Sequence, residues 1–510
     1  MSQENAQREV IEFLSRPQSY GPTVEKVERI ETHGAIVFLA GTRAYKLKRA
    51  VRFPYMDYST PERRRAMCEA ELSINRQTAP MLYEAVCPVT READGLRIGG
   101  LGPAVDWLVV MRRFDQEALL DRVAARGELT RDLIVAIAEA VAAFHAIAPP
   151  ATAFGGAAAM AAVVDGNRAS LLEAAPAILD TGAVTAFDAQ CRQALAAVAD
   201  LLDRRRQDGF VRRCHGDLHL GNICLIDGRP VLFDAIEFNE HIASIDTLYD
   251  FAFLLMDLEH RRLRDLANAA LNAYLDTTGD DGGLAALPLF LACRAGVRAH
   301  TSAAAARAQS DEMRRRTLID AARSYLSLAP QFLAPTAGRI VAIGGLSGTG
   351  KSTVARAIAP RLGRAPGAVV LRSDVIRKRL AGVPPTTRLD AAAYTPAVST
   401  RVYRELAERA HRIAAAGQVV IADAVFAKPE ERSLIEEAAR SAAVPFTGIW
   451  LTAPAAELRA RIRGRTGDAS DATVAVLEQQ LTYELGKIAW ERVDAGGDPS
   501  ATAATVQGLI

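Results

Sequence analysis

The chain has 510 residues, of which 50% are hydrophobic and 24% are charged, so it is globular and long enough for more than one hydrophobic core. Its 61 Lys and Arg residues against 60 Asp and Glu residues give a net charge of +1, which argues against a dedicated nucleic-acid binder. The polar N-terminal stretch does not fit a signal peptide, and the Ala-rich stretch 135–164 is interrupted by charged residues and prolines, so we expect a cytoplasmic protein without a membrane partner.

The first predicted elements alternate strands with one helix. Residues 29–52 hold an apolar run, a short turn and a partly alternating segment, which is typical of a β-hairpin. A helix over 63–76 follows the Ser-Thr-Pro-Glu segment 59–62, because Ser or Thr caps a helix and Pro is favoured in its first turn. After a glycine-rich turn, the apolar segment 107–111 predicts a short buried strand.

Helical patterns dominate from about 117 to 206 and again from 244 to 328, with a region of loops and strands at 210–240 between them. Pro330 and Pro335, followed by Thr-Ala-Gly, predict a linker over 330–338. Beyond it the sequence predicts strands at 340–343, 368–371, 419–422 and 446–451 and helices from 351, near 375–381, over 397–415 and near 429–442. This alternation is typical of a parallel, doubly wound sheet.

The segment Gly-Leu-Ser-Gly-Thr-Gly-Lys-Ser at 345–352 fits the phosphate-binding pattern Gly-x-x-x-x-Gly-Lys-[Ser/Thr] between a strand and a helix. Glycines allow backbone N–H groups to turn toward a phosphate, and the helix N-terminus adds partial positive charge. Lys351 is expected to bridge two phosphates and Ser352 to ligate Mg²⁺. The predicted nucleotide-binding residues are Gly345, Ser347, Gly348, Thr349, Gly350, Lys351, Ser352 and Thr353.

Acidic and basic residues downstream of this loop indicate a kinase. Asp374 follows a predicted strand, where its carboxylate can accept a proton from a hydroxyl group, and Asp423 ends the next strand, where it can hold Mg²⁺ or substrate. Arg461 and Arg465 lie at the start of a polar segment and can neutralise phosphoryl charge from a closing lid. This pattern resembles small P-loop kinases of the gluconate kinase, shikimate kinase and chloramphenicol phosphotransferase type, and the kinase domain of polynucleotide kinases.

A second motif, His-Gly-Asp-Leu-His-Leu-Gly-Asn, occupies 215–222 and is followed by two short strand segments that end at Asp234. Phosphoryl transfer needs a carboxylate that orients and deprotonates the acceptor hydroxyl, and oxygen ligands for Mg²⁺. Asp217 suits the first role, and Asn222 and Asp234 suit the second.

The second motif resembles that of the aminoglycoside phosphotransferase-like kinases, which include choline and fructosamine kinases and share the bilobal protein-kinase fold. The resemblance implies that the hairpin at 29–52 covers ATP, that Lys46 pairs with its phosphates and that Glu71 orients this lysine. Lys48 is the alternative to Lys46, and Glu69 is the alternative to Glu71. The resemblance also implies a hinge at Met111 that contacts adenine through its backbone.

The whole chain resembles bacterial proteins that fuse an aminoglycoside phosphotransferase-like kinase to a P-loop ATP-binding domain. We therefore predict an α/β and α+β chain: a bilobal kinase-like domain over 1–329 (small lobe about 1–111, large lobe about 115–329), a linker over 330–338 and a P-loop domain over 339–510. The predicted function is bifunctional, ATP- and Mg²⁺-dependent phosphorylation of hydroxyl groups on small polar metabolites such as a sugar, sugar acid or amino alcohol. In one alternative, either domain senses nucleotide and regulates the other. In another, the P-loop domain phosphorylates a nucleic-acid 5′-hydroxyl. The sequence patterns indicate neither the acceptor nor the oligomeric state.

Overall fold

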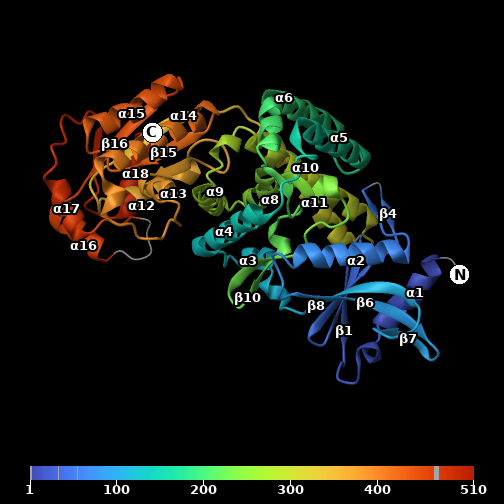
Figure 1. Cartoon of the computed structure of the whole chain (residues 1–510). Coiled ribbons are helices and arrows are strands. Elements are labelled where there is room, and N and C mark those ends of the chain that lie inside the picture. The colour runs from blue at the N-terminus through green and yellow to red at the C-terminus, as the bar shows by residue number, and fades with distance from the viewer. Residues whose placement is uncertain (1–2, 33, 54, 465–469) are drawn as a thin grey trace. The chain divides into compact units, whose positions relative to one another are not determined.

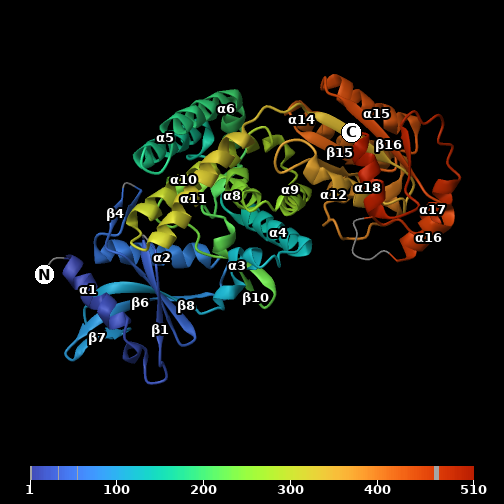
Figure 2. The same cartoon turned by 180° about the vertical axis from the view of Figure 1, so that it is seen from behind.

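A computed structural model describes residues 3–32, 34–53, 55–464 and 470–510. It divides into two compact units, which we describe separately. The first unit comprises Met1–Val184, Ala199–Asp257 and Val297–Arg323, and the second comprises Thr185–Val198, Leu258–Gly296 and Ser324–Ile510. Figure 1 labels the elements of both units, and Figure 2 shows them from behind.

The first unit contains a six-stranded antiparallel sheet (Figure 1). Its order is β1 (Val27–Glu31), β2 (Ala35–Ala40), β3 (Arg43–Lys48), β8 (Ala104–Arg112), β6 (Tyr83–Glu92) and β7 (Gly95–Ile98). The pairing of β2 with β3 confirms the predicted hairpin, and β8 contains the predicted buried strand. The sequence pattern did not predict β6 and β7, because Pro88 interrupts β6 and the register shifts twice along its pairing with β8.

Helix α2 (Pro61–Asn75) confirms the helix predicted from its capping residues, and it packs on β6 and β8. The Thr60 hydroxyl accepts a hydrogen bond from the backbone N–H of Arg63, and Pro61 occupies the first turn. Cys68 of α2 joins Val109 of β8 in a hydrophobic cluster. This packing fixes the helix face that carries Glu71.

The remaining elements of the first unit are mostly helical, and α6, α8, α10 and α11 continue into the second unit. The antiparallel pairs β9 (Val211–Arg213) with β12 (Ser244–Asp246) and β10 (Ile223–Ile226) with β11 (Arg229–Leu232) confirm the predicted region of loops and strands. The other elements are α1 (Gln3–Leu14), η1 (Pro17–Tyr20), β4 (Arg52–Phe53), β5 (Met56–Asp57), η2 (Gln116–Ala118), α3 (Leu120–Ala125), α4 (Arg131–Ile147), α5 (Gly156–Ala174), α6 (Thr181–Gln207), η3 (Leu220–Asn222), α7 (Glu240–Ala243), α8 (Thr247–His260), α10 (Leu287–Ala308) and α11 (Glu312–Phe332).

The second unit contains the predicted parallel sheet (Figure 2). Its order is β14 (Val369–Arg372), β15 (Val419–Asp423), β13 (Arg339–Gly344), β16 (Phe446–Thr452) and β17 (Glu491–Asp494). Val341 and Ile343 of β13 share a hydrophobic cluster with α12 (Lys351–Ile358) and α18 (Pro499–Gly508), because alternate residues of a strand face the same side. The other elements are α9 (Arg264–Thr278), η4 (Asp281–Gly283), η5 (Ala359–Arg361), α13 (Ser373–Leu380), η6 (Ala391–Tyr394), α14 (Pro396–Ala415), α15 (Pro429–Ser441), α16 (Ala455–Arg463) and α17 (Val474–Leu481).

Helix α9 covers the edge strand β14. The Asn268 side-chain amide donates to the carbonyl of Ala368 at 3.0 Å, and the backbone N–H of Val370 donates to the Asn272 side-chain carbonyl at 2.7 Å. These contacts satisfy backbone groups that an edge strand otherwise leaves unpaired. They also support the strand that leads to Asp374.

The start of the predicted linker is helical, because α11 continues through Pro330 to Phe332. Pro330 has no N–H to donate to the carbonyl of Leu326, and the helix ends two residues after it. Residues 333–338 then form no helix or strand before β13 begins. Across the described residues, the helices lack the combination of length and apolar character that spanning a bilayer requires.

Candidate active sites

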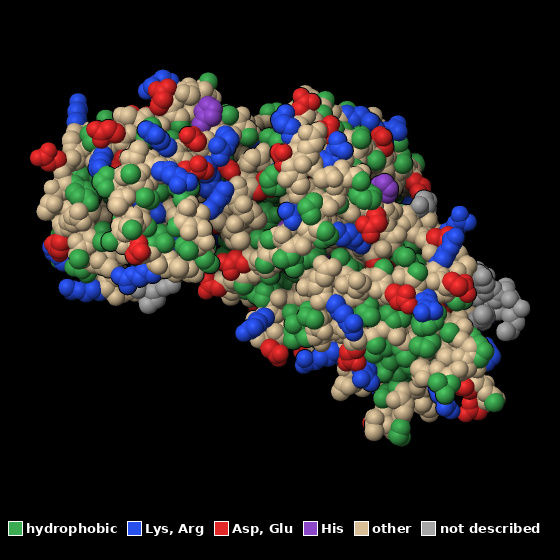
Figure 3. Space-filling model, viewed as in Figure 1, with side chains coloured by type: hydrophobic (Ala, Val, Ile, Leu, Met, Phe, Trp, Pro, Cys, Tyr) green, Lys and Arg blue, Asp and Glu red, His purple; other side chains and the backbone are tan. Residues whose placement is uncertain are grey.

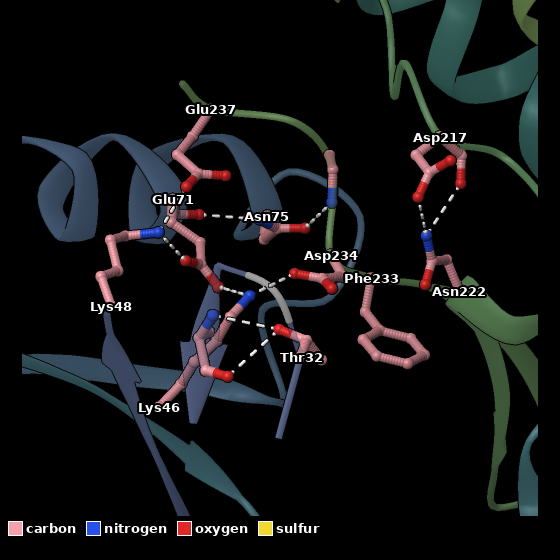
Figure 4. A network of polar contacts seen from close by, with 12 residues as sticks. Thr32, Lys46, Lys48, Glu71, Asn75, Asp217, Asn222, Phe233, Asp234 and Glu237 are labelled. Carbon is pink, nitrogen blue, oxygen red and sulfur yellow. Dashed lines mark hydrogen bonds and ion pairs between the residues drawn. The ribbon is translucent and has the colours of Figure 1, made fainter. Parts of the chain in front are cut away.

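The first candidate site lies against strand β3, where two lysines contact one glutamate (Figure 4). Lys46 Nζ donates to Glu71 Oε1 at 2.8 Å and to Asp234 Oδ1 at 2.5 Å. Lys48 Nζ donates to Glu71 Oε2 at 2.6 Å and also to Glu237. Both alternatives for the lysine therefore contact Glu71, whereas Glu69 pairs with Arg65 on the exposed side of α2.

Glu71 is the centre of this cluster, and its side chain is fully buried. Burial raises the pKa of Glu71, but the neighbouring ammonium groups of Lys46 and Lys48 outweigh this effect and lower the pKa to about 2. The carboxylate is therefore ionised at neutral pH and holds both lysines by charge-assisted hydrogen bonds.

Asp217 and Asn222 contact each other in the loop before β10 (Figure 4). The Asn222 amide donates to the Asp217 carboxylate and to its backbone carbonyl, both at 2.9 Å. Burial raises the pKa of Asp217, but His219, whose Nε2 lies 3.5 Å from Asp217 Oδ2, contributes to a net pKa well below the usual range. Asp217 is thus an ionised acceptor held in a fixed orientation.

A buried hydrogen-bond network holds the loop that carries Asp217. His215 Nε2 contacts the carbonyl of Phe233 at 2.8 Å, and its Nδ1 accepts the backbone N–H of Asp217 at 3.3 Å. Burial lowers the pKa of His215, so the ring is neutral and can donate with one nitrogen and accept with the other. Asp250 accepts the backbone N–H groups of His215 and Gly216 at 3.1 and 2.8 Å.

A cavity of about 350 Å³ joins these groups. Its lining includes Lys46, Met111, Asp217, Asn222 and Asp234. Met111 lies within β8, opposite Ala44 of β3 and Tyr83 of β6.

The second candidate site is the loop between β13 and α12. Gly345 and Gly348 have φ angles of +141° and +89°, which favour glycine. A Cβ atom at Gly345 would lie 2.6 Å from the carbonyl oxygen of Leu451, so only glycine fits there. Except for Gly345, the predicted nucleotide-binding residues of this loop line a cavity of about 990 Å³.

Three side-chain hydrogen bonds define the chemistry of this loop. Lys351 Nζ donates to the loop carbonyls of Gly345 and Leu346 at 2.8 and 3.0 Å. The Ser352 hydroxyl donates to Asp423 Oδ2 at 2.5 Å, which brings two hard oxygen donors together at the end of β15. Such a donor pair fits Mg²⁺, which prefers oxygen ligands.

Asp374 and Arg461 line the same cavity as the phosphate-binding loop. Burial raises the pKa of Asp374, and the neighbouring Asp423 raises it further while Arg372 lowers it. Arg461 donates to Glu457 at 2.5 Å and to the carbonyl of Gly497 at 3.2 Å. Arg465, the other predicted lid arginine, lies outside the described residues.

The structure adds polar residues that the motifs did not indicate. In the second site, the Gln480 side chain accepts the backbone N–H of Ser347 at 2.8 Å. Asp471 accepts hydrogen bonds from Lys378 Nζ at 3.1 Å and from the Tyr394 hydroxyl at 2.7 Å.

In the first site, Asn75, Tyr58 and Glu237 surround the lysine cluster. Their spacing in the sequence matches no short pattern, so only the folded chain identifies them.

Comparisons with known proteins find a match to a protein family in each of two segments of the chain. Residues 56–287 match the family described as the phosphotransferase enzyme family, and residues 340–484 match a family described as an AAA domain. Uncharacterized proteins of Mycobacterium tuberculosis and Mycobacterium bovis are 29% identical over 478 residues, which cover 92% of this chain and 92% of each relative.

Solved structures also match parts of this chain. A choline/ethanolamine kinase family protein from Mesorhizobium loti matches 64% of this chain and 98% of its own, with 15% identity and a TM-score of 0.40. An APS kinase from Mycobacterium tuberculosis in complex with AMPPNP and APS matches 34% of this chain and 98% of its own, with 21% identity and a TM-score of 0.26. A gluconokinase from Sinorhizobium meliloti matches 34% and 96%, with 24% identity and a TM-score of 0.23.

The family matches, together with the two sites, define the protein as a phosphotransferase enzyme. The segment that matches the phosphotransferase enzyme family contains Asp217, Asn222 and Asp234 of the first site, and the segment that matches the AAA domain contains the phosphate-binding loop of the second.

Proposed function

We propose that the protein is a bifunctional kinase that transfers the γ-phosphoryl group of ATP to hydroxyl groups of small polar metabolites at two separate sites. The observation that carries the proposal is the grouping, twice in one chain, of a lysine, an acidic proton acceptor and oxygen donors around one cavity. Phosphoryl transfer is catalysed mainly by positioning and charge stabilisation, and these residue types supply both.

In the first site we assign proton acceptance to Asp217, which the Asn222 amide and the loop network orient. Lys46 binds the phosphates, and Glu71 orients Lys46. Asn222 and Asp234 would hold Mg²⁺, which would supply positive charge to offset the negative charge of the phosphates. We propose Met111 for the adenine side of the cavity, which it lines.

In the second site we assign proton acceptance to Asp374, whose raised pKa suits a group that must take up a proton. The loop 345–353 and Lys351 bind the phosphates, while Ser352 and Asp423 would hold Mg²⁺. Arg461 stabilises charge on the transferred group, and Arg465 is proposed for the same role from its sequence position alone.

The charge distribution favours small acceptors over a nucleic acid. Figure 3 shows Lys and Arg side chains interspersed with Asp and Glu side chains on the visible face of the second unit. A protein that binds an extended phosphate backbone concentrates basic residues along one track, because each phosphate contact releases a counterion.

The test measures ADP formation by the full chain against a panel of sugars, sugar acids and amino alcohols. We expect Asp217→Ala to reduce turnover of one class of acceptor by about 10²–10⁴-fold, the usual contribution of a general base. Lys351→Ala should reduce turnover of a different acceptor class. The controls are Asp94→Ala, which removes an exposed carboxylate of the β6–β7 turn, and Lys26→Ala, which removes an exposed lysine before β1.

Retention of all ADP formation by the double variant Asp217→Ala/Lys351→Ala would contradict the proposal. Loss of both activities in either single variant would instead favour a chain in which one domain regulates the other. Transfer to a short oligonucleotide that falls steeply with added salt would favour the nucleic-acid alternative.

A further inference from the structure

Lys48 is a second lysine beside the nucleotide site of the first unit, and the proposed transfer reaction assigns it no role. It lies two residues after Lys46 on β3, so both side chains point to the same side of the sheet. Each lysine contacts a different oxygen of Glu71: Lys46 contacts Oε1 and Lys48 contacts Oε2. Two separate contacts stop the carboxylate from rotating, which one contact cannot do.

Both lysines line the cavity, but they differ in exposure. The Lys46 side chain is 13% exposed, whereas the Lys48 side chain is 1% exposed and lies against the ring of Tyr58, 4.9 Å from its centroid. A phosphate can therefore reach Lys46 more readily than Lys48. The buried lysine needs a permanent partner, because an unpaired buried charge is strongly destabilising.

Glu237 is that partner, and it connects Lys48 to the proposed metal-binding segment. Lys48 and the Tyr58 hydroxyl both donate to Glu237 Oε1, the hydroxyl at 2.5 Å. Glu237 follows Asp234 by three residues, and Asp234 has a φ angle of +63°, an uncommon conformation for a residue other than glycine. The surrounding contacts must hold this segment in place, and the pair of Lys48 with Glu237 is one of them (Figure 4).

The charges of the cluster show why two lysines are needed. Three carboxylates, those of Glu71, Asp234 and Glu237, face the ammonium groups of Lys46 and Lys48. An ammonium group has three donors, and Lys46 directs two of them to Glu71 and Asp234, which leaves one for a nucleotide phosphate. Glu71 would then depend on Lys46 alone if Lys48 were absent.

We propose that Lys48 is a positioning residue: it holds Glu71 and Glu237 in place while Lys46 contacts a nucleotide phosphate. This inference rests on the proposed function of the first site. It assigns different roles to two lysines that the sequence presents as alternatives.

The experiment uses the full chain with Lys351→Ala, which weakens nucleotide binding at the second site, as the parent. Lys48→Met and Lys48→Met/Glu237→Gln are compared with it, and Arg43→Met, which removes an exposed cation from the same strand, is the control. Isothermal titration with AMPPNP and Mg²⁺ measures affinity, and thermal unfolding measures stability.

We expect Lys48→Met to lower the thermal midpoint, because it leaves Glu237 buried without its cation. The double variant should regain most of the midpoint, because it removes both charges. Its nucleotide affinity should stay about tenfold or more below that of the parent, because Glu71 lacks its second lysine. Arg43→Met should match the parent in both measurements.

Recovery of parental affinity together with stability in the double variant would overturn the inference, because Lys48 would then contribute only to folding. Unchanged affinity in Lys48→Met would overturn it as well. If the Lys351→Ala parent binds no nucleotide whereas the unchanged chain does, the proposed function of the first site fails, and the inference fails with it.

Discussion

Asn75 connects helix α2 to the segment that carries Asp234, and its replacement tests this connection. Its amide donates to the carbonyl of Glu71 at 2.9 Å, and its side-chain carbonyl accepts the backbone N–H of Ala235 at 2.8 Å. Asn75 is fully buried, and Ala235 is 2% exposed, so water cannot replace either contact in the folded state. Asn75→Ala therefore leaves the Ala235 N–H buried without this partner.

A buried donor without a partner costs about 1–3 kcal/mol, and the lost hydrogen bond to the Glu71 carbonyl adds about 1 kcal/mol. We therefore expect Asn75→Ala to lower the free energy of unfolding of the first unit by about 2–4 kcal/mol. The Ala235 amide should also exchange with solvent about 10- to 100-fold faster, since about 1.4 kcal/mol corresponds to tenfold. Hydrogen exchange measured by mass spectrometry on peptides that contain Ala235, with urea unfolding in parallel, checks both values.

Gln77→Ala is the matched control, because Gln77 is an exposed carboxamide two residues further along the chain. It should change the free energy of unfolding by less than about 0.5 kcal/mol. Equal exchange at Ala235 in the Asn75 and Gln77 variants would refute the view that Asn75 holds the Asp234 segment.

Three further predictions concern stability. Asp106→Ala leaves the guanidinium of Arg64 buried without the carboxylate that it contacts at 2.7 Å, so the free energy of unfolding in urea should fall by about 3–5 kcal/mol. The double variant Arg64→Met/Asp106→Leu should recover most of this loss, and a loss below about 1 kcal/mol in Asp106→Ala would contradict a buried pair. Burial lowers the pKa of His300 from 6.5 to about 4, so its contribution to stability is complete above pH 6.5 and is lost as the pH falls toward 4. His300→Gln should therefore reduce the loss of stability between pH 7 and pH 4.5 by about 2.5 kcal/mol, and acid unfolding curves that coincide with those of the unchanged chain would argue against this. Asn272→Leu removes the acceptor of the Val370 N–H and should destabilise the second unit by about 1–3 kcal/mol in urea, whereas an unchanged midpoint would show that β14 does not depend on α9.

Strong local patterns account for the part of the fold that the sequence predicted. Strands β13, β14 and β15 of the parallel sheet are largely buried on both faces and appear as apolar runs, as in β15, where every residue is buried. Helix α2 begins with a cap and a proline that signal its first turn. In contrast, β17 has four residues and only one of them is buried, so its place in the sheet depends on β16 rather than on its own sequence.

The residues of the candidate sites also fall into two groups, those that a sequence motif predicts and those that only the structure reveals. Asp217, Asn222 and Lys351 lie in short contiguous motifs whose spacing is typical of phosphate and metal binding, so the sequence predicts them as site residues. Gln480 and Glu237 act across long sequence separations or outside any motif, and a single polar residue in a helix or loop carries no signal of its partner. The sequence favoured Lys46 through the family resemblance but left Lys48 as an alternative, because residues two apart on a strand share a face.

The proposed phosphate-binding lysines of both sites contact the chain's own oxygen atoms in this structure, but the groups differ in charge. Lys46 contacts the carboxylate of Asp234, whereas Lys351 contacts the neutral carbonyls of Gly345 and Leu346. Where a phosphate replaces one of these contacts, only the difference between the new and the old interaction contributes to affinity. Losing a carbonyl contact leaves a dipole, which water or a neighbouring N–H can satisfy. Losing the contact with Asp234 leaves a negative charge that needs another cation, since nearby phosphates are also negative. Nucleotide binding at the first site is therefore expected to depend more strongly on a divalent cation than binding at the second.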